Sequence, residues 1–236
     1  MRTTILSDLQ AAKNAPHFGL EFFVPDSETA MDALIIRIDR MTAFQPLFIS
    51  VTGGSTLDDL ALFVKKLLVL PVKILIRIDC TELLRPALKD LLDVLKKHDV
   101  KNILVDHENS FGSGRHGGFS SSLDVVKFIK HNYRHQFCIS ATCVPEYASS
   151  VNGEYQQIET MKALVQAGVG FFVSEIIFDC RLYFDFVHLC SHYGVTIPII
   201  PTVMPIQTYN SFEKIANTYD IHIPQVSPLI MHGIQP

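Results

Sequence analysis

One carboxylate in the sequence lies inside an apolar segment, an environment that is typical of catalytic acids. Glu21 lies within Gly-Leu-Glu-Phe-Phe-Val-Pro at positions 19–25, between large apolar side chains. Because an apolar environment favours the protonated form of a carboxylic acid, Glu21 is a candidate general acid. The alternative is a structural ion pair with a basic neighbour such as Arg77, since carboxylates in apolar surroundings also occur in such pairs.

Two further segments have the composition of ligand-binding loops. Thr52-Gly53-Gly54-Ser55 follows an apolar segment and precedes a helical pattern, so a ligand could approach its backbone and an anion could bind the helix N-terminus. A simple strand-to-helix turn is the alternative. The glycine-rich segment 112–118 lacks the phosphate-binding pattern GxxxxGK[ST] and is interpreted as a mobile loop. Polar residues also stand at 106–109 and 145–147.

The cysteines and histidines do not form a metal-binding pattern. His188 and His192 stand four residues apart in a probable helix, but no third ligand is apparent and Cys190 between them would face away. The five cysteines form no CxxC pair and are interpreted as reduced core thiols. We therefore expect no metal site.

These candidates are positioned by short apolar segments that alternate with amphipathic ones. The expected strands are 18–23, 47–51, 72–78, 102–105, 137–141, 170–178 and 197–203. The expected helices are 27–40, 56–66, 83–97, 123–131, 158–167 and 182–192, with Ser27 and Thr56 at helix starts and Gly168 and Gly194 after helix ends. Such alternation predicts parallel βαβ units with strands covered on both faces.

Seven strands predict an α/β fold, a (β/α)8 TIM-barrel-like domain over residues 1–236 that lacks the eighth strand. In such barrels the functional groups come from the carboxyl ends of the strands. An unpaired strand edge in an apolar sheet invites association. We therefore expect a homo-oligomer or a protein partner that covers the open barrel edge.

Composition excludes several classes of partner. Hydrophobic residues make up 48% of the 236 residues and charged residues 19%, with a net charge of −4. Weak acidity without a lysine-rich segment argues against nucleic acid, and no apolar segment approaches the ~18 residues of a membrane span. The N-terminus lacks the apolar centre of a secretory signal. We expect a cytoplasmic protein, with the mitochondrion as the alternative because Arg2, Thr3 and Thr4 are presequence-like.

Several segments together resemble methylenetetrahydrofolate reductase, the flavin barrel of one-carbon metabolism. They include Phe18–Pro25, Phe48–Gly54 and the Pro-Glu dipeptide at 145–146. The most specific piece runs from Met161 to Gly168, through Phe171–Asp179, and into Ile199–Ile206. The order and spacing match across nearly the whole chain.

The resemblance implies a reaction and roles for two residues. In this family NAD(P)H reduces bound FAD, and reduced FAD passes hydride to 5,10-methylenetetrahydrofolate, which becomes 5-methyltetrahydrofolate. A glutamic acid at the end of the first strand assists opening of the folate ring to an iminium ion, and Glu21 occupies that place. Thr52 matches a threonine that lies against the flavin.

Other positions depart from the family pattern. The family's Arg-Gly-Asp, whose Asp lies by flavin and pterin, aligns with His107, Glu108 and Asn109, so Asn109 retains hydrogen bonding without the charge. The glutamine that grips the pterin becomes Glu175. Other cofactor and folate contacts, including a histidine, a tyrosine, a lysine and a phenylalanine, are replaced at Ile74, Val144, Ala148, Leu164 and Ile215.

These departures leave three hypotheses. One lost contact to a dinucleotide costs roughly 1–3 kcal/mol, and several together would take FAD out of reach. The first hypothesis is an active enzyme with Glu21 as acid, FAD as cofactor, NAD(P)H as reductant and a folate substrate. The second is a flavin-free pseudoenzyme that serves as a binding or scaffold subunit. A third is a barrel that binds a smaller ligand through Glu21, Thr52, Asn109 and Glu175.

Overall fold

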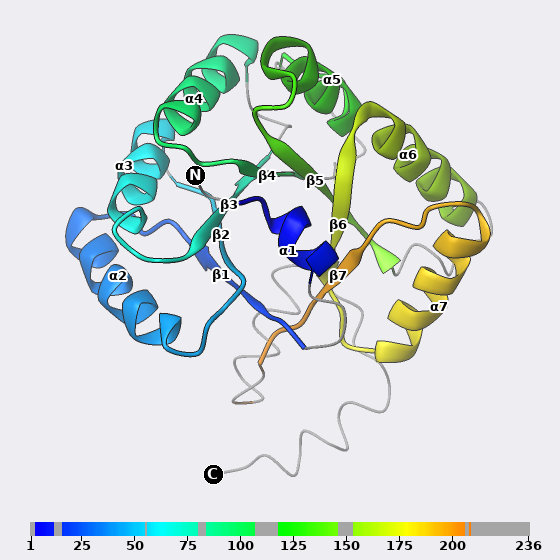
Figure 1. The fold of residues 1–236 in the computed structure, drawn as a ribbon, viewed down its shortest axis with the longest axis horizontal. Helices are drawn as coiled ribbons and strands as arrows, with labels where there is room; N and C mark the ends of the chain where they lie inside the picture. Colours follow the sequence, from blue (N-terminus) through cyan, green and yellow to red (C-terminus); the bar gives the residue numbers. More distant parts are fainter. Residues whose placement is uncertain are drawn as a thin grey trace.

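Seven parallel strands form one curled sheet in chain order (Figure 1). The computed structural model describes residues 3–11, 16–54, 56–79, 84–106, 118–145, 153–205 and 208. The strands are β1 (Gly19–Phe23), β2 (Phe48–Thr52), β3 (Lys73–Ile78), β4 (Asn102–Val105), β5 (Cys138–Cys143), β6 (Val169–Ile176) and β7 (Ile199–Thr202). Each overlaps a strand expected from the sequence.

Six helices connect these strands and cover the outer face of the sheet (Figure 1). They are α2 (Glu28–Thr42), α3 (Leu57–Leu67), α4 (Arg85–Lys97), α5 (Ser122–Tyr133), α6 (Gly153–Ala167) and α7 (Cys180–His192). Ser27 and Thr56 cap α2 and α3 by accepting backbone hydrogen bonds, as predicted. Gly168 and Gly194 follow α6 and α7 with φ of 105° and 89°, the left-handed backbone that favours glycine.

The architecture is a TIM-barrel-like α/β fold with an open side. Within the described residues the sheet ends at β1 on one edge and β7 on the other, and no eighth strand joins them. This part of the chain therefore confirms the predicted seven-stranded barrel. The same residues include no helix that is long and apolar enough to cross a membrane.

Two apolar cores hold the barrel together. The outer core lies between the sheet and the helices and contains the residues of each strand that point outward, such as Ile76 and Ile103. The inner core fills the barrel with Phe48, Leu75, Leu104, Phe171 and Val173, and Ile5 packs among them. Because apolar side chains occupy the barrel interior, a polar site can form only at its ends.

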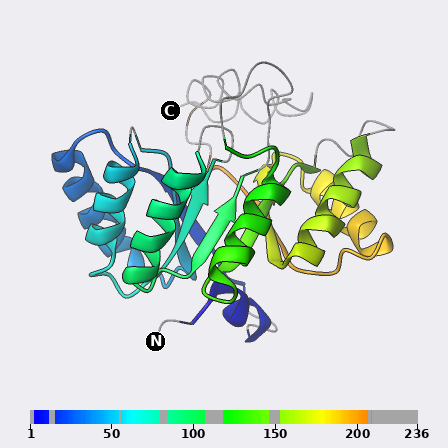
Figure 2. The ribbon, with the colours of Figure 1, turned by 90° about the horizontal axis from the view of Figure 1, so that it is seen from above.

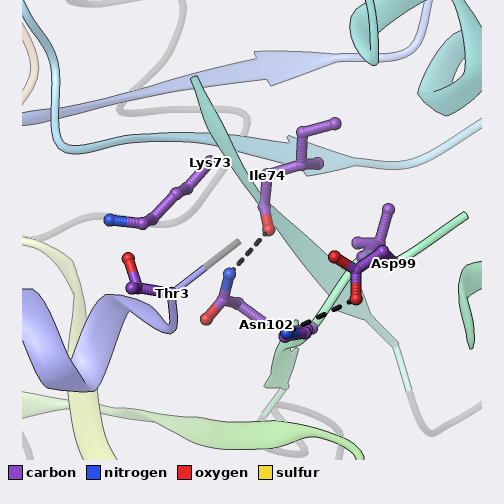
Figure 3. Close-up of a pocket in the computed structure, with 7 residues that line it drawn as sticks. Thr3, Lys73, Ile74, Asp99 and Asn102 are labelled. Carbon is purple, nitrogen blue, oxygen red and sulfur yellow. Dashed lines mark hydrogen bonds and ion pairs between the residues drawn. The ribbon is translucent and has the colours of Figure 1, made fainter. Parts of the chain in front are cut away.

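A helix that the sequence did not predict closes the amino-terminal end of the barrel. Helix α1 (Ile5–Ala11) lies beneath the strands, on the opposite side from their carboxyl ends (Figure 2). Ile5 is fully buried, and its backbone N–H donates to Asn102 Oδ1 at 2.9 Å. Asn102 in turn donates to the Ile74 carbonyl at 3.2 Å (Figure 3).

Charge and shape also fix α1. Lys73 forms an ion pair with Asp8, and burial lowers the pKa of Lys73. Gly170 has no side chain where Leu6 packs: a Cβ there would lie 2.7 Å from Leu6 Cδ2. A small pocket lies beside Lys73 and Asn102, and its lining also includes Thr3, Ile74 and Asp99 (Figure 3).

Ile5→Ala tests the contribution of α1 to stability. The variant leaves a cavity in the inner core and should lower the free energy of unfolding by about 2–4 kcal/mol, measured by urea denaturation. Gln10→Ala, on the exposed face of α1, is the control and should leave the unfolding free energy nearly unchanged. Equal stability of Ile5→Ala and the control would show that α1 does not support the barrel.

Candidate functional site

Polar side chains gather at the carboxyl ends of the strands. Side chains alternate between the two faces of a strand, so residues two apart share a face. Leu75 and Leu104 belong to the inner core. Arg77 stands two residues after Leu75 and Asp106 two residues after Leu104, so their side chains face the inside of the barrel as well. Arg77 forms ion pairs with Glu21, Asp106 and Glu175, and Asp106 accepts a hydrogen bond from Thr142. We call these five residues the Arg77 cluster.

Arg77 is the centre of this cluster. Its Nη2 lies 2.7 Å from Glu175 Oε1, and its Nε lies 2.9 Å from Asp106 Oδ2. Nη2 also donates to Asp106 Oδ1 at 3.1 Å, so the Arg77–Asp106 pair is bidentate. Nη1 lies 3.4 Å from Glu21 Oε1, the longest of these contacts. One guanidinium therefore contacts three carboxylates from three strands.

Asp106 has a second anchor in β5. Thr142 is buried and its Oγ1 donates to Asp106 Oδ1 at 3.0 Å. The backbone N–H of Asp106 donates to the Ile78 carbonyl at 3.0 Å, which extends the β3–β4 ladder by one residue. These bonds hold the carboxylate of Asp106 at the edge of the Arg77 guanidinium that carries Nε–H and Nη2–H.

Glu175 owes its position to an irregularity in β6. Val173 pairs with Ile200 and Ile176 pairs with Thr202, so β6 has one extra residue between the two pairs. Ser174 Oγ accepts the backbone N–H of Thr202 at 2.9 Å across this gap. Such bulges redirect side chains near functional sites. Here the bulge lies at Glu175, whose carboxylate contacts Arg77.

The charges of the Arg77 cluster depend on one another. Burial alone would lower the pKa of Arg77, but Asp106, Glu175 and Glu21 together raise it, so the guanidinium stays charged. Burial raises the pKa of Glu175; Asp106 and Glu21 add to this effect, and Arg77 opposes it. Because three carboxylates share one cation, the carboxylate oxygens of the cluster can accept hydrogen bonds from further donors.

An apolar surface lies beside the cluster at the ends of β1 and β2. Thr52 ends β2 and pairs with Phe23 in β1, and Phe23 is 62% exposed. Gly53 has a φ of 78°, and a Cβ added there would lie 3.8 Å from the Phe23 ring. A flat ring could therefore rest on Phe23 close to the Gly53 backbone, with the Thr52 hydroxyl beside it.

The chain matches one family of known proteins along nearly its whole length. The family model described as methylenetetrahydrofolate reductase matches residues 6–235. The chain belongs to the methylenetetrahydrofolate reductase family.

Curated relatives from several kingdoms share this similarity. Methylenetetrahydrofolate reductase (NADH) 1 of Zea mays is 28% identical over 225 residues, and methylenetetrahydrofolate reductase 2 of Saccharomyces cerevisiae is 30% identical over 241 residues. These matches cover 88% and 94% of this chain but only 38% and 39% of the relatives, so the chain spans about two fifths of their length. The 5,10-methylenetetrahydrofolate reductase of Salmonella typhimurium is 22% identical over 99% of this chain and 79% of its own.

Solved structures of low identity support the fold alone. A 2,3-dimethylmalate lyase matches with a TM-score of 0.55 at 9% identity, over 99% of this chain and 94% of that one. The 3-dehydroquinate dehydratase of Geobacillus kaustophilus matches with a TM-score of 0.56 at 10% identity, over 82% of this chain and 75% of that one.

The structure brings two of the four predicted site residues of this reductase-family chain into contact with one cation. Glu21 and Glu175 both contact Arg77, and Thr52 lies at the end of the neighbouring strand β2. Glu21 therefore forms the ion pair with Arg77 that the sequence offered as the alternative to a catalytic role. Asn109 lies outside the described residues.

Other positions singled out from the sequence lie elsewhere. Ile74 and Leu164 are buried in the outer core, so neither side chain points to the Arg77 cluster. Cys190 is buried while His188 and His192 are exposed, which agrees with the expectation that Cys190 faces away from the two imidazoles. The remaining positions, His107, Glu108, 112–117, Glu146, Tyr147, Ala148 and Ile215, lie outside the described residues.

Sequence reasoning did not find the centre of the site. The sequence indicates Arg77 only as an ion-pair neighbour of Glu21, and it gives no indication of Thr142. The indication is an arginine near the carboxyl end of the strand Lys73–Ile78, whose other residues after Lys73 are apolar, because a charge in a covered strand requires a partner. Thr142 follows Ser140 at alternate positions of β5, which is an ordinary inward-facing pattern.

Arg77→Met tests the interdependence of these charges. The variant leaves three carboxylates without their cation and should lower the free energy of unfolding by about 3 kcal/mol at neutral pH. The measurement is urea denaturation, with Lys89→Met as the control because the Lys89–Asp93 pair on α4 is exposed. A variant Arg77→Met as stable as Lys89→Met would mean that the carboxylates do not depend on Arg77.

Proposed function

We propose that this chain acts in folate one-carbon metabolism by the reaction of its family, reduction of 5,10-methylenetetrahydrofolate to 5-methyltetrahydrofolate with NAD(P)H. The observation that carries the proposal is the position of Glu21. Its carboxylate stands at the barrel mouth, and the family resemblance assigns the acid to this residue. Within the described part of the chain its one ion pair is the 3.4 Å contact to Arg77. A loosely held carboxyl group can exchange this contact for one to a ligand.

The other carboxylates of the Arg77 cluster would recognise the pterin. Carboxylate oxygens accept hydrogen bonds, and the amino and ring N–H groups of a reduced pterin are donors. Glu175 Oε1 accepts from Arg77, and no other described side chain donates to its second oxygen, which we therefore propose as the acceptor for the ligand. Glu175 thereby takes the place of the family's glutamine as a substrate-binding residue.

Glu21 would act on the one-carbon unit. A protonated carboxyl at this position donates its proton to the ring nitrogen whose bond to the one-carbon unit breaks, which produces the iminium ion. The inner core beneath the cluster, with Leu75 and Leu104, excludes water from the interior side of the reacting groups.

For the ring of the family cofactor we propose a site at the ends of β1 and β2. Phe23, Thr52 and Gly53 offer an exposed aromatic face, a hydroxyl and a backbone without a side chain at the ends of adjacent strands. Thr52 would hold FAD here, together with Asn109 of the family pattern. When bound, FAD supplies the hydride that it receives from NAD(P)H.

Glu21→Gln tests the proposed acid. The amide retains the size and an acceptor for Arg77 but has no acidic proton, so reductase activity should fall at least about 100-fold while the unfolding transition is preserved. The assay follows NAD(P)H oxidation with added FAD and methylenetetrahydrofolate. Glu159→Gln, in the exposed pair with Lys162 on α6, is the matched control. Unchanged turnover of Glu21→Gln would remove Glu21 from the mechanism.

A second candidate function is a flavin-free binding or scaffold subunit, and a specific observation favours it. Arg77 contacts all three carboxylates, so the cluster is also a complete structural ion-pair network. Exposed apolar residues are frequent on the elements that border the open side of the barrel. They are Phe18, Phe23, Ile36, Met41, Phe44, Leu182, Phe184 and Val203.

For this candidate function we propose that a second copy of the chain covers the open side of the barrel. Figure 1 shows α2 and α7 on either side of the opening between β1 and β7. An exposed apolar surface beside unpaired strand edges is typical of an association surface. A homodimer would cover the open side in both copies.

Sedimentation velocity tests the association. The full chain should sediment as a dimer, and Phe184→Glu should shift it toward the monomer because Phe184 is 57% exposed on α7. Val69→Glu is the control, since Val69 is 79% exposed after α3, away from the opening. A wild-type protein that is a cooperatively folding monomer would contradict this proposal.

A further inference from the structure

The three carboxylates that contact Arg77 are not held equally. Asp106 has a bidentate bond to Arg77 at 2.9 and 3.1 Å, and Thr142 provides a further bond at 3.0 Å. Glu175 has a 2.7 Å bond to the same guanidinium and lies in a bulge closed by Ser174. Among the residues that the structure describes, Glu21 has one such contact, at 3.4 Å to Arg77 Nη1.

We propose that Arg77 is the positioning residue of this site: it fixes Glu175 and Asp106 as oriented acceptors for the N–H donors of a reduced pterin and leaves Glu21 free to move onto the ligand. This inference rests on the proposed folate function and adds a residue to it. Arg77 acts through the carboxylates and is not itself required to touch the substrate.

The geometry of a guanidinium explains why an arginine is needed. Its donors lie in one plane in a fixed fork, so the direction of each carboxylate is set by the direction of an N–H bond. Nε and Nη2 face Asp106, Nη2 also reaches Glu175, and Nη1 points to Glu21. A lysine ammonium retains the charge but cannot hold Asp106 in a bidentate bond.

The same geometry indicates the class of ligand. The donors of Arg77 face carboxylates, so the cluster offers acceptors to a ligand rather than a cation. A ligand with several N–H donors on a flat ring and no anionic group at that end fits these acceptors and the neighbouring ring of Phe23. The pteridine end of a reduced folate has this character.

The test is a double-mutant cycle on the full chain with 5-methyltetrahydrofolate as the probe, measured by titration calorimetry. Arg77→Lys should weaken binding about tenfold or more, because an oriented charge-assisted hydrogen bond is lost. Glu175→Gln retains an acceptor and should weaken binding by less. If Arg77 acts through Glu175, the Arg77→Lys change should cost clearly less in the Glu175→Gln background than in the wild type.

Thr142→Val supplies a variant that leaves Arg77 untouched. It removes the second anchor of Asp106 without a large change in volume and should weaken binding by a few-fold. Urea denaturation of each variant confirms that the protein is folded at the titration temperature.

The outcomes separate this inference from the proposed function. Wild-type protein that takes up no 5-methyltetrahydrofolate would overturn the proposed function and this inference with it. Binding by the wild type with equal affinity in Arg77→Lys would overturn the inference alone. A loss that is fully additive with Glu175→Gln would also overturn it, because Arg77 would then not act through that carboxylate.

Discussion

The contact of Arg77 with three carboxylates is the interaction on which the functional end of this barrel depends. Carboxylates that converge in a half-buried space repel one another, and desolvation raises the free energy of each ionised form. A single guanidinium offsets both effects at once, since its fork reaches Asp106, Glu175 and Glu21 from one position on β3. The position of Arg77 depends on the strand register, because a slip of β3 by one residue would turn its side chain toward the outer core.

The apolar interior decides where this polar cluster can lie. Phe48, Leu75, Leu104 and Phe171 fill the barrel, and α1 covers its amino-terminal end with Ile5. At the mouth, around the carboxyl ends of the strands, the side chains of Glu21, Arg77 and Glu175 are half-buried rather than fully enclosed. The Arg77 cluster thus rests on an apolar floor, which strengthens its hydrogen bonds and keeps water to one side of it.

Local patterns in the sequence were sufficient for most of the fold. The apolar strands, the amphipathic helices and the capping residues Ser27 and Thr56 each depend on a few neighbouring residues, and the structure confirms them. Helix α1 escaped prediction because its seven residues are too few for a clear periodic pattern. Its anchor, Asn102, is 97 residues away in the sequence.

The site was predictable only in part, for the same reason. The apolar surroundings of Glu21 indicate a candidate acid, with an ion pair to Arg77 as the alternative, whereas Glu175 is indicated by the family resemblance alone. That one arginine would join β1, β4 and β6 depends on the curvature of the sheet and on the bulge at Ser174–Glu175. No short sequence pattern contains either feature, so the shared cation became apparent only in three dimensions.

The account depends most directly on whether a folate can be reduced at this mouth. The decisive measurement mixes the full chain with FAD, removes free flavin by gel filtration, reduces the bound flavin with light under anaerobic conditions and adds 5,10-methylenetetrahydrofolate. We expect the visible flavin band to return as hydride passes to the folate. A protein that emerges colourless from the column, or a band that stays bleached after the folate is added, would contradict the reductase account.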